Sequence, residues 1–379
     1  MKAKRVILPN GSVIGILGGG QLGRMIALEA KKMGYDVICM DPTPNSPCGQ
    51  FADEQIVAEL NDTKAALELA KKSDVVIYEF ENINAGLVEE VEKEYYLPQG
   101  SKILKVSQDR FNEKNQLKQS GFPVVPFHIV NDAAELKSTV KSIGYPCVLK
   151  TIRGGYDGKG QYVLKGGEDL EVVIDVFGQK DAEFVLEKYL NLSGEVSVII
   201  ARKENGEIIS YPVVENIHRE NILHMSMVPA RVPEEIKLKA VEIAKGIADE
   251  LKVVGLLVVE FFIVGNEVIV NELAPRPHNS GHYTLDACYV SQFEQLIRAV
   301  CNLPFGSTEL LTPVVMVNIL GKHLKKLLDK IPTFKSNVKV HLYGKRGEFS
   351  EKRKIGHVTI VADDITQTVD YVEKSGIWS

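Results

Sequence analysis

The stretch "LLVVEFFIVGNEVIVNEL", Leu256–Leu273, has the pattern of a β-hairpin: two runs of apolar, largely β-branched residues flank a turn that contains glycine and asparagine. Each run is interrupted by one carboxylate, Glu260 in the first and Glu272 in the second. Both glutamates stand among residues that otherwise have the pattern of a buried sheet. A charged group in such a place is costly unless it has a partner, so the two glutamates indicate a site.

The register of this hairpin decides whether the two carboxylates meet. A two-residue turn at Gly265 and Asn266 would put them on opposite faces of the sheet, whereas a three-residue loop would set Glu260 directly across from Glu272. We predict the three-residue loop, which also pairs Phe262 with Val270. Like charges opposed on a sheet repel each other, so this register favours a shared hard cation such as Mg²⁺. Two unrelated glutamates at a sheet edge are the alternative.

Composition limits the classes of protein to consider. The 379 residues are 45% hydrophobic and 25% charged, as expected for a globular chain with two or three domains. The net charge of −5 gives no overall attraction to nucleic acid or to an anionic membrane, so we predict neither partner. Five scattered cysteines without CxxC spacing predict reduced thiols and a cytoplasmic protein. Neither a cleavage site nor a long apolar run stands out, so we predict no cleavable leader and no membrane helix.

The chain divides into three parts by pattern. In the first hundred residues short apolar β-branched runs alternate with helical patterns, which predicts a parallel, doubly wound α/β sheet. From about Val124 long alternating strands are joined by glycine turns, which is typical of an α+β unit. A third segment with three β-like runs follows "NLPFGST". We predict domains at 1–106, 107–303, with a flap subdomain at about 124–186, and 304–379.

Two glycine-rich stretches are candidate phosphate sites. "GILGGGQLGRM" contains GxGxxG at Gly18, Gly20 and Gly23 between a predicted strand and a helix, and Asp41 ends the next strand as a ribose-binding acid would. Alone, this motif favours a nicotinamide or flavin enzyme, or only close packing of strand and helix.

The second stretch is "VLKTIRGGYDGKGQYVL". It is not a Walker A loop, because Lys159 is followed by glycine and then by a strand. Its four glycines, with Lys150 on the preceding strand, suit a mobile flap over a nucleotide's phosphates. A flexible exposed hairpin is the alternative.

These motifs, in this order, resemble the ATP-grasp ligases. The closer resemblance is to the 5-(carboxyamino)imidazole ribonucleotide synthases, and it is carried by "GILGGGQLGRM", "YEFENI", "GGYDGKGQ", "NELAPRPHNSGH" and "HLYGK" with "RKIGH" across almost the whole chain. The resemblance implies an ATP-grasp fold, α/β and α+β, with an N-terminal doubly wound, Rossmann-like domain and a small, mainly β C-terminal domain. It implies a purine-biosynthetic ligase that uses Mg²⁺, ATP, bicarbonate and aminoimidazole ribonucleotide, with carboxyphosphate as intermediate, and a homodimer.

The resemblance also implies roles for individual residues. Glu260 and Glu272 match the metal ligands, although Ala274 stands where many ATP-grasp enzymes have an asparagine. The residues that match the ATP site are Arg110, Lys150, Gly155, Tyr156, Asp157, Gly158, Lys159, Gly160, Gln161, Glu187, Lys188, Tyr189, Leu190, Glu195, His218, Asn271 and Glu272.

Bicarbonate and the ribonucleotide have separate groups of matching residues. Arg276, His278 and Asn279 match the positions that hold bicarbonate and carboxyphosphate, and Lys159 is expected to assist phosphoryl transfer. Asp157 is our candidate for the base that takes the amine proton. The residues that match the ribonucleotide site are Gln21, Leu22, Glu79, Lys345 and Arg353. His282 is equally consistent with a structural hydrogen bond.

Three other interpretations remain open at this stage. A Rossmann dehydrogenase would explain only the first glycine motif, and a non-catalytic ATP-binding protein would not need the bicarbonate and ribonucleotide residues. Another ATP-grasp ligase, such as a formate-dependent glycinamide ribonucleotide transformylase, is the most serious alternative.

Overall fold

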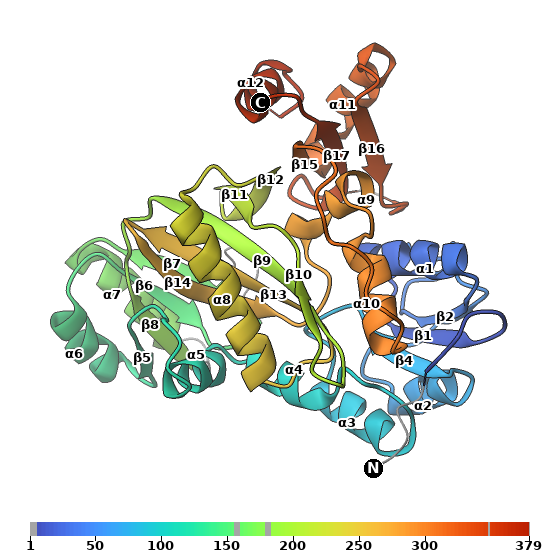
Figure 1. The fold of residues 1–379 in the computed structure, drawn as a ribbon. Helices are drawn as coiled ribbons and strands as arrows, with labels where there is room; N and C mark the ends of the chain where they lie inside the picture. The colour runs from blue at the N-terminus through green and yellow to red at the C-terminus, as the bar shows by residue number, and fades with distance from the viewer. Residues whose placement is uncertain (1–5, 155–159, 179–182, 348, 379) are drawn as a thin grey trace.

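The computed structural model describes residues 6–154, 160–178, 183–347 and 349–378. Its first part is a parallel sheet in the order β3 (Glu54–Ile56), β2 (Asp36–Met40), β1 (Val13–Leu17) and β4 (Val75–Tyr78), which confirms the doubly wound prediction. Helices α1 (Gln21–Met33), α2 (Thr63–Lys71) and α3 (Ala85–Glu94) cross over between or follow these strands, and the unit lies at the lower right of Figure 1.

Two helices connect this sheet to a small antiparallel one. They are α4 (Ser101–Ser107) and α5 (Arg110–Gln119). The small sheet has the order β5 (Phe127–Val130), β8 (Phe184–Lys188), β6 (Cys147–Thr151) and β7 (Gln161–Leu164). Helices α6 (Ala133–Ile143) and α7 (Gly167–Gly178) pack with it around a separate small core, at the left of Figure 1.

The large sheet forms the centre of the molecule. Its strands run β14 (Glu267–Ala274), β13 (Gly255–Val264), β9 (Gly194–Arg202), β11 (Val214–Arg219), β12 (Ile222–Val228), β15 (Val314–Leu320), β17 (Lys354–Val361) and β16 (Val338–Leu342), and β10 (Ile208–Ser210) pairs with β9. Apolar side chains of β9, β13 and β14 pack against α8 (Glu234–Glu250) on one face. On the other face α10 (Gln292–Val300) joins β9 and β13 to α1 in one shared core.

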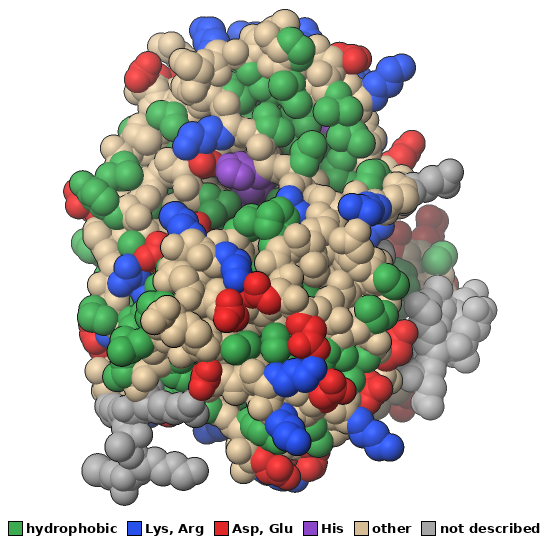
Figure 2. Space-filling view, turned by 90° about the vertical axis from the view of Figure 1, so that its right-hand side faces the viewer, with side chains coloured by type: hydrophobic (Ala, Val, Ile, Leu, Met, Phe, Trp, Pro, Cys, Tyr) green, Lys and Arg blue, Asp and Glu red, His purple; other side chains and the backbone are tan. Residues whose placement is uncertain are grey.

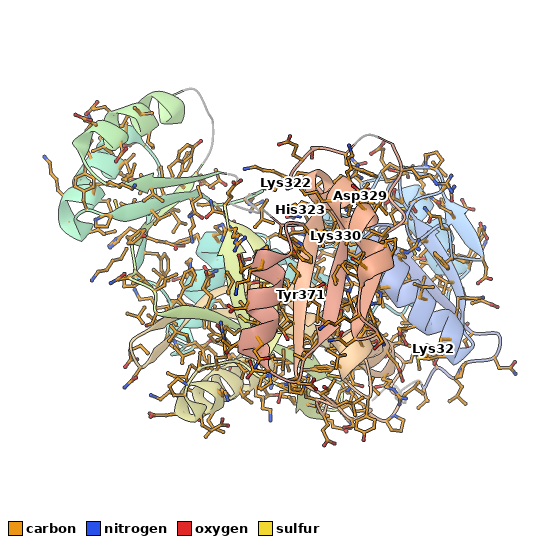
Figure 3. All side chains as sticks on the ribbon, turned by 90° about the horizontal axis from the view of Figure 1, so that it is seen from above. Lys32, Lys322, His323, Asp329, Lys330 and Tyr371 are labelled. Carbon is orange, nitrogen blue, oxygen red and sulfur yellow. The ribbon has the colours of Figure 1, made fainter. Side chains whose placement is uncertain are left out.

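The C-terminal segment does not form a sheet of its own. Its three predicted strands are present as β15, β16 and β17, but β12 pairs directly with β15 and makes them a continuation of the large sheet. Helices α11 (Leu324–Lys330) and α12 (Ile365–Lys374) flank these strands. Figure 3 looks down on this end, with Tyr371 on α12 and Lys322 and His323 beside α11.

The surface agrees with the small net charge. On the face shown in Figure 2 acidic and basic side chains are interspersed, and apolar side chains gather near the top, at the end that the C-terminal segment forms. All five cysteines are free and buried, as predicted. No helix among the described residues is long and apolar enough to cross a membrane.

The turn between β1 and α1 depends on a close approach that only glycine permits. Gly18 has φ +104°, and a Cβ there would lie 2.7 Å from Cγ of Glu79. Gly11 also has a positive φ, +93°, but a Cβ there would have nothing within 4 Å.

We therefore expect Gly18→Ala to lower the free energy of unfolding more than Gly11→Ala. Both pay the left-handed backbone cost, about 1–2 kcal/mol, whereas only Gly18→Ala adds an overpacking cost of about 1–3 kcal/mol. Melting temperatures of the two variants measure this difference. Equal losses of stability would mean that Glu79 moves away freely and that the approach is not a constraint.

Candidate active site

A cavity of about 1040 Å³ lies where the three sheets meet. Its lining comes from the glycine turn before α1, the small sheet, strands β9, β11, β12, β13 and β14, and the loop after β14. It gathers nearly all of the predicted site residues that the structure describes: Gln21, Leu22, Glu79, Arg110, Lys150, Gly160, Gln161, Glu187, Lys188, Tyr189, Leu190, Glu195, His218, Glu260, Asn271, Glu272, Arg276, His278 and Asn279. The predicted flap positions Gly155, Tyr156, Asp157, Gly158 and Lys159 lie outside the described residues.

Glu260 and Glu272 are opposite each other on β13 and β14, as predicted, but the register of the hairpin differs from the predicted one. The turn is the two-residue one, because Val264 pairs with Glu267, so the predicted three-residue loop and the pairing of Phe262 with Val270 are wrong. Instead the register shifts between Glu260 and Phe261. This β-bulge places Asn271 as the extra residue and brings Glu272 opposite Glu260.

Helix α5 supports the bulged part of β14 with three residues on one face. Glu113 accepts from the Leu273 amide at 3.1 Å, and Lys114 Nζ donates to the Asn271 carbonyl at 3.3 Å. Arg110 Nη1 lies 3.3 Å from Glu272 Oε2. Glu113 and Lys114 were not among the predicted site residues, because charged residues in a helix usually face solvent. Their spacing from Arg110, three and four residues, was the available signal.

A negative charge on Glu260 is unfavourable in this position. Burial, followed by the charge of Glu272, raises the pKa of Glu260 to about 7. His278 Nε2 lies 3.1 Å from Glu260 Oε1, and burial lowers the pKa of His278, which keeps the imidazole neutral. Nearby, His218 Nδ1 pairs with Glu195 Oε2 at 3.1 Å. A cation between the two carboxylates would relieve both the repulsion and the burial cost, so the residues fit a divalent metal.

The pair supplies only two protein ligands. No group of three or more His, Cys, Asp or Glu arranged to hold a metal occurs in the described ranges. Mg²⁺ commonly takes one or two carboxylates and completes its shell with phosphate oxygens and water, so two ligands suffice for a metal that arrives with a nucleotide.

A buried ion triad joins α5 to strands β6 and β8 of the small sheet. Lys150 Nζ is 2.8 Å and Lys114 Nζ 3.1 Å from separate oxygens of Glu187. Although burial opposes ionisation, the two ammonium groups lower the pKa of Glu187 to about 2. Burial lowers the pKa of Lys150. Two lysines share one glutamate, so the triad keeps a net positive charge, and Lys150 presents it at the cavity wall.

Two carboxylates from other parts of the chain accept hydrogen bonds from the amides of the glycine turn before α1. Glu79 accepts from the amides of Gly20 at 2.8 Å and Gly23 at 3.0 Å, and Asp41 accepts from the Gly19 amide at 3.0 Å. Burial raises the pKa of Glu79. The amides that would face a dinucleotide's pyrophosphate in a Rossmann enzyme thus already have anionic partners.

The loop after β14 carries the groups predicted for bicarbonate. Arg276 forms a bidentate pair with Glu81, with Nη2 2.7 Å from Oε1. Glu81 was not among the predicted site residues, although it lies within "YEFENI". Asn279 has both amide atoms buried with no hydrogen-bond partner among the described residues. Such orphaned atoms indicate a position for a polar ligand. His282 also lines the cavity, and its Nδ1 lies 3.3 Å from the Gln292 amide.

The two predicted phosphate residues of the C-terminal segment do not line the cavity, whereas Lys354 does. Lys345 Nζ donates to the Lys354 carbonyl at 2.7 Å, and burial, then Arg353, lowers the pKa of Lys345 to about 8. Arg353 is exposed. The hairpin nevertheless carries five basic residues, Lys345, Arg346, Lys352, Arg353 and Lys354, and Lys354 brings it to the cavity.

Family models match three successive parts of the chain: a ribonucleotide synthetase preATP-grasp domain at residues 12–108, an ATP-grasp domain at 115–293 and a phosphoribosylaminoimidazole carboxylase C-terminal domain at 314–370. The N5-carboxyaminoimidazole ribonucleotide synthase of Bacillus subtilis is 49% identical over 360 residues, which cover 95% of this chain and 93% of that protein.

Solved structures agree. An N5-carboxyaminoimidazole ribonucleotide synthetase in complex with ADP has a TM-score of 0.96 at 51% identity over 99% of both chains. An Aspergillus clavatus synthase in complex with ADP and 5-aminoimidazole ribonucleotide has a TM-score of 0.90 at 30% identity, over 97% of this chain and 99% of that one. The chain therefore belongs to the N5-carboxyaminoimidazole ribonucleotide synthase family of ATP-grasp enzymes and is an ATP-dependent carbon–nitrogen ligase.

Proposed function

We propose that this ligase carboxylates the amine of 5-aminoimidazole ribonucleotide with bicarbonate in purine biosynthesis, with carboxyphosphate as the intermediate. The observation that carries the proposal is the meeting, in one cavity, of the carboxylate pair, the ion pair of Lys150 with Glu187 and the Arg276–Asn279 loop beside the glycine turn. The ADP and aminoimidazole ribonucleotide bound by the Aspergillus relative support it.

The reaction starts from a poor electrophile. Bicarbonate becomes reactive when one of its oxygens attacks the γ-phosphorus of ATP and the bond to the bridging oxygen breaks, which gives carboxyphosphate and ADP. When bound, Mg²⁺ supplies charge neutralisation on the transferring phosphoryl group. Glu260 and Glu272 would hold it, Lys150 would neutralise phosphate oxygens, and Lys159, outside the described residues, is proposed to do the same from the flap.

ATP would lie between the small sheet and β14. Glu187 to Leu190 would face the adenine, Glu195 and His218 the ribose, and the flap from Gly155 to Gln161 the phosphates. Arg110 and Asn271 complete this proposed site, and the Asn271 side-chain oxygen has no hydrogen-bond partner among the residues described.

Carboxyphosphate would be held by Arg276, His278 and Asn279. Burial opposes the charge of Arg276, but the carboxylates of Glu81, Glu79 and Glu272 outweigh it and raise the pKa of Arg276. The guanidinium therefore stays charged. The amine nitrogen of the ribonucleotide attacks the carboxyl carbon, phosphate leaves, and one amine proton is released. We propose Asp157 as its acceptor and Gln21, Leu22 and Glu79 as contacts of the ribonucleotide. A homodimer and a cytoplasmic location stay predictions.

Substrate-dependent ADP release tests this function. We expect release with aminoimidazole ribonucleotide plus bicarbonate, and only background release with glycinamide ribonucleotide plus formate. Both pairs offer a planar anion and a ribonucleotide amine, so the expected difference is supported by the family of the chain and by the aminoimidazole ribonucleotide that the Aspergillus relative binds. Release with the second pair alone would assign the chain to a formate-dependent ligase instead.

The metal assignment predicts the behaviour of the carboxylate pair. Glu260→Gln and Glu272→Gln should each abolish Mg²⁺-dependent turnover with the fold intact, as measured by ADP release and circular dichroism. Without metal each should raise the free energy of unfolding by about 0.2–1 kcal/mol, because a like-charge contact is removed. Glu267→Gln is the matched control, since Glu267 lies exposed on the same hairpin. Wild-type turnover in either site variant would refute the assignment.

The basic hairpin of the C-terminal segment is proposed to bind the phosphate of the ribonucleotide. If Lys345 and Arg353 act here, changing both to Ala should raise the KM for aminoimidazole ribonucleotide strongly, since charge-assisted hydrogen bonds contribute about 1.5–3 kcal/mol each. The KM for ATP should barely change.

Two further variants locate this phosphate site. Lys352→Ala is the control, because Lys352 is 67% exposed and pairs with Glu220. Lys354→Ala tests the neighbour that lines the cavity. An effect confined to Lys354→Ala would move the phosphate site to that residue and away from the predicted pair.

A further inference from the structure

A line of buried polar side chains leads away from Glu260 through the large sheet. Ser197 on β9 and Ser226 on β12 each interrupt an apolar run, Asn216 lies on the mixed strand β11, and Ser280 lies in the short 3-10 helix η1 (Asn279–Gly281). The three serines are 0% exposed and Asn216 is 5% exposed. The role proposed above for the cavity does not use any of the four.

Hydrogen bonds connect these residues in sequence. Ser226 Oγ donates to Asn216 Oδ1 at 2.8 Å, and Asn216 Nδ2 donates to Ser197 Oγ at 2.9 Å. Ser197 Oγ lies 2.8 Å from Ser280 Oγ, which lies 2.9 Å from His278 Nδ1. The line therefore ends on the ring whose other nitrogen faces Glu260.

The Ser280 backbone amide fixes which atoms donate in the hydrogen bonds next to His278. The Ser280 amide N–H donates to His278 Nδ1 at 3.3 Å, and an N–H cannot accept, so Nδ1 carries a lone pair. The Ser280 hydroxyl must then also donate to Nδ1, and Ser197 must donate to Ser280. Every member of the line donates in one direction, toward His278. A neutral imidazole that accepts at Nδ1 has its hydrogen on Nε2, 3.1 Å from Glu260 Oε1.

We propose that Ser226, Asn216, Ser197 and Ser280 are positioning residues that hold His278 in its neutral Nε2–H tautomer, so that it donates to Glu260 and fixes that carboxylate opposite Glu272. The consequence for the metal rests on the proposed function, whereas the tautomer does not. Hydrogen bonds that all run in one direction polarise one another, so a break in the middle weakens the contact at the end.

Nuclear magnetic resonance of the ligand-free protein with ¹⁵N-labelled histidine tests the tautomer directly. We expect His278, assigned by the signal that disappears in His278→Gln, to carry its hydrogen on Nε2. Ser280→Ala should raise the fraction of the Nδ1–H form about fivefold, the effect of one lost neutral hydrogen bond. Ser197→Ala should shift it in the same direction by less. A wild-type His278 with hydrogen on Nδ1 would overturn the proposal. The tautomer is read from the wild-type protein, and His278→Gln serves only to assign the signal.

The Mg²⁺ dependence of turnover then distinguishes a positioning role of these serines from a purely structural one. Ser280→Ala and Ser197→Ala should raise the Mg²⁺ concentration needed for half-maximal turnover about three- to tenfold, with the KM for aminoimidazole ribonucleotide within about twofold of wild type. The double variant should equal Ser280→Ala alone, because the line is already broken next to the ring. Effects that multiply instead would mean independent residues and would refute the line.

Two more variants keep the test decisive. Ser101→Ala removes another buried hydroxyl, which donates to Glu92 at 2.6 Å, and should change stability without changing the tautomer or the metal dependence. Ser226→Ala breaks the line at its far end and replaces Ser280→Ala if that variant does not fold. Loss of stability in Ser226→Ala and Ser197→Ala with an unchanged tautomer would leave only a structural role and overturn the proposal. Absence of carboxylation in the wild type would count against the proposed function alone.

Discussion

The rest of the site depends on one unfavourable contact, the two carboxylates that face each other across β13 and β14. In a regular hairpin with this turn Glu272 would lie on the face opposite to Glu260, and the bulge at Asn271 is what turns it. A bulge leaves backbone groups without ladder partners, and α5 supplies them through Glu113 and Lys114. The backbone therefore forces the two carboxylates together. Arg110 contacts Glu272 and His278 contacts Glu260, so each carboxylate has a partner that offsets the repulsion.

Charge compensation extends over the whole cavity. Arg276 is paired with Glu81, two lysines share Glu187, and the amides of the glycine turn are paired with Glu79 and Asp41. An anionic substrate therefore enters a site whose cations are already oriented by carboxylates, so little reorganisation is needed when phosphate charge arrives. The same pairing explains why a GxGxxG turn does not make this protein a dehydrogenase, an alternative that the family membership removes.

The continuous sheet brings three distant parts of the chain to one place. Because β12 pairs with β15, the basic hairpin after β16 is carried back toward the first domain, where Gln50 Nε2 donates to the Gly344 carbonyl at 2.8 Å. If the C-terminal strands formed a separate sheet, strand pairing would not fix the position of this hairpin relative to the first domain. The predicted domain limits remain predictions, although the three family models fall on the same three successive segments.

The sequence by itself determined the parallel first sheet, the strands of the C-terminal segment, the two glutamates of the hairpin and many of the residues that line the cavity, because apolar period and residue chemistry are local properties. Only the tertiary structure decided how the glutamates come to face each other, since a bulge depends on partners from α5 that lie about 160 positions away in sequence. It also decided which ions pair, Glu81 with Arg276 and Glu187 with two lysines. Finally, the polar line from Ser226 to His278 consists of single residues on three strands and a turn, and no sequence pattern states that their side chains meet, because contacts between elements depend on packing in three dimensions.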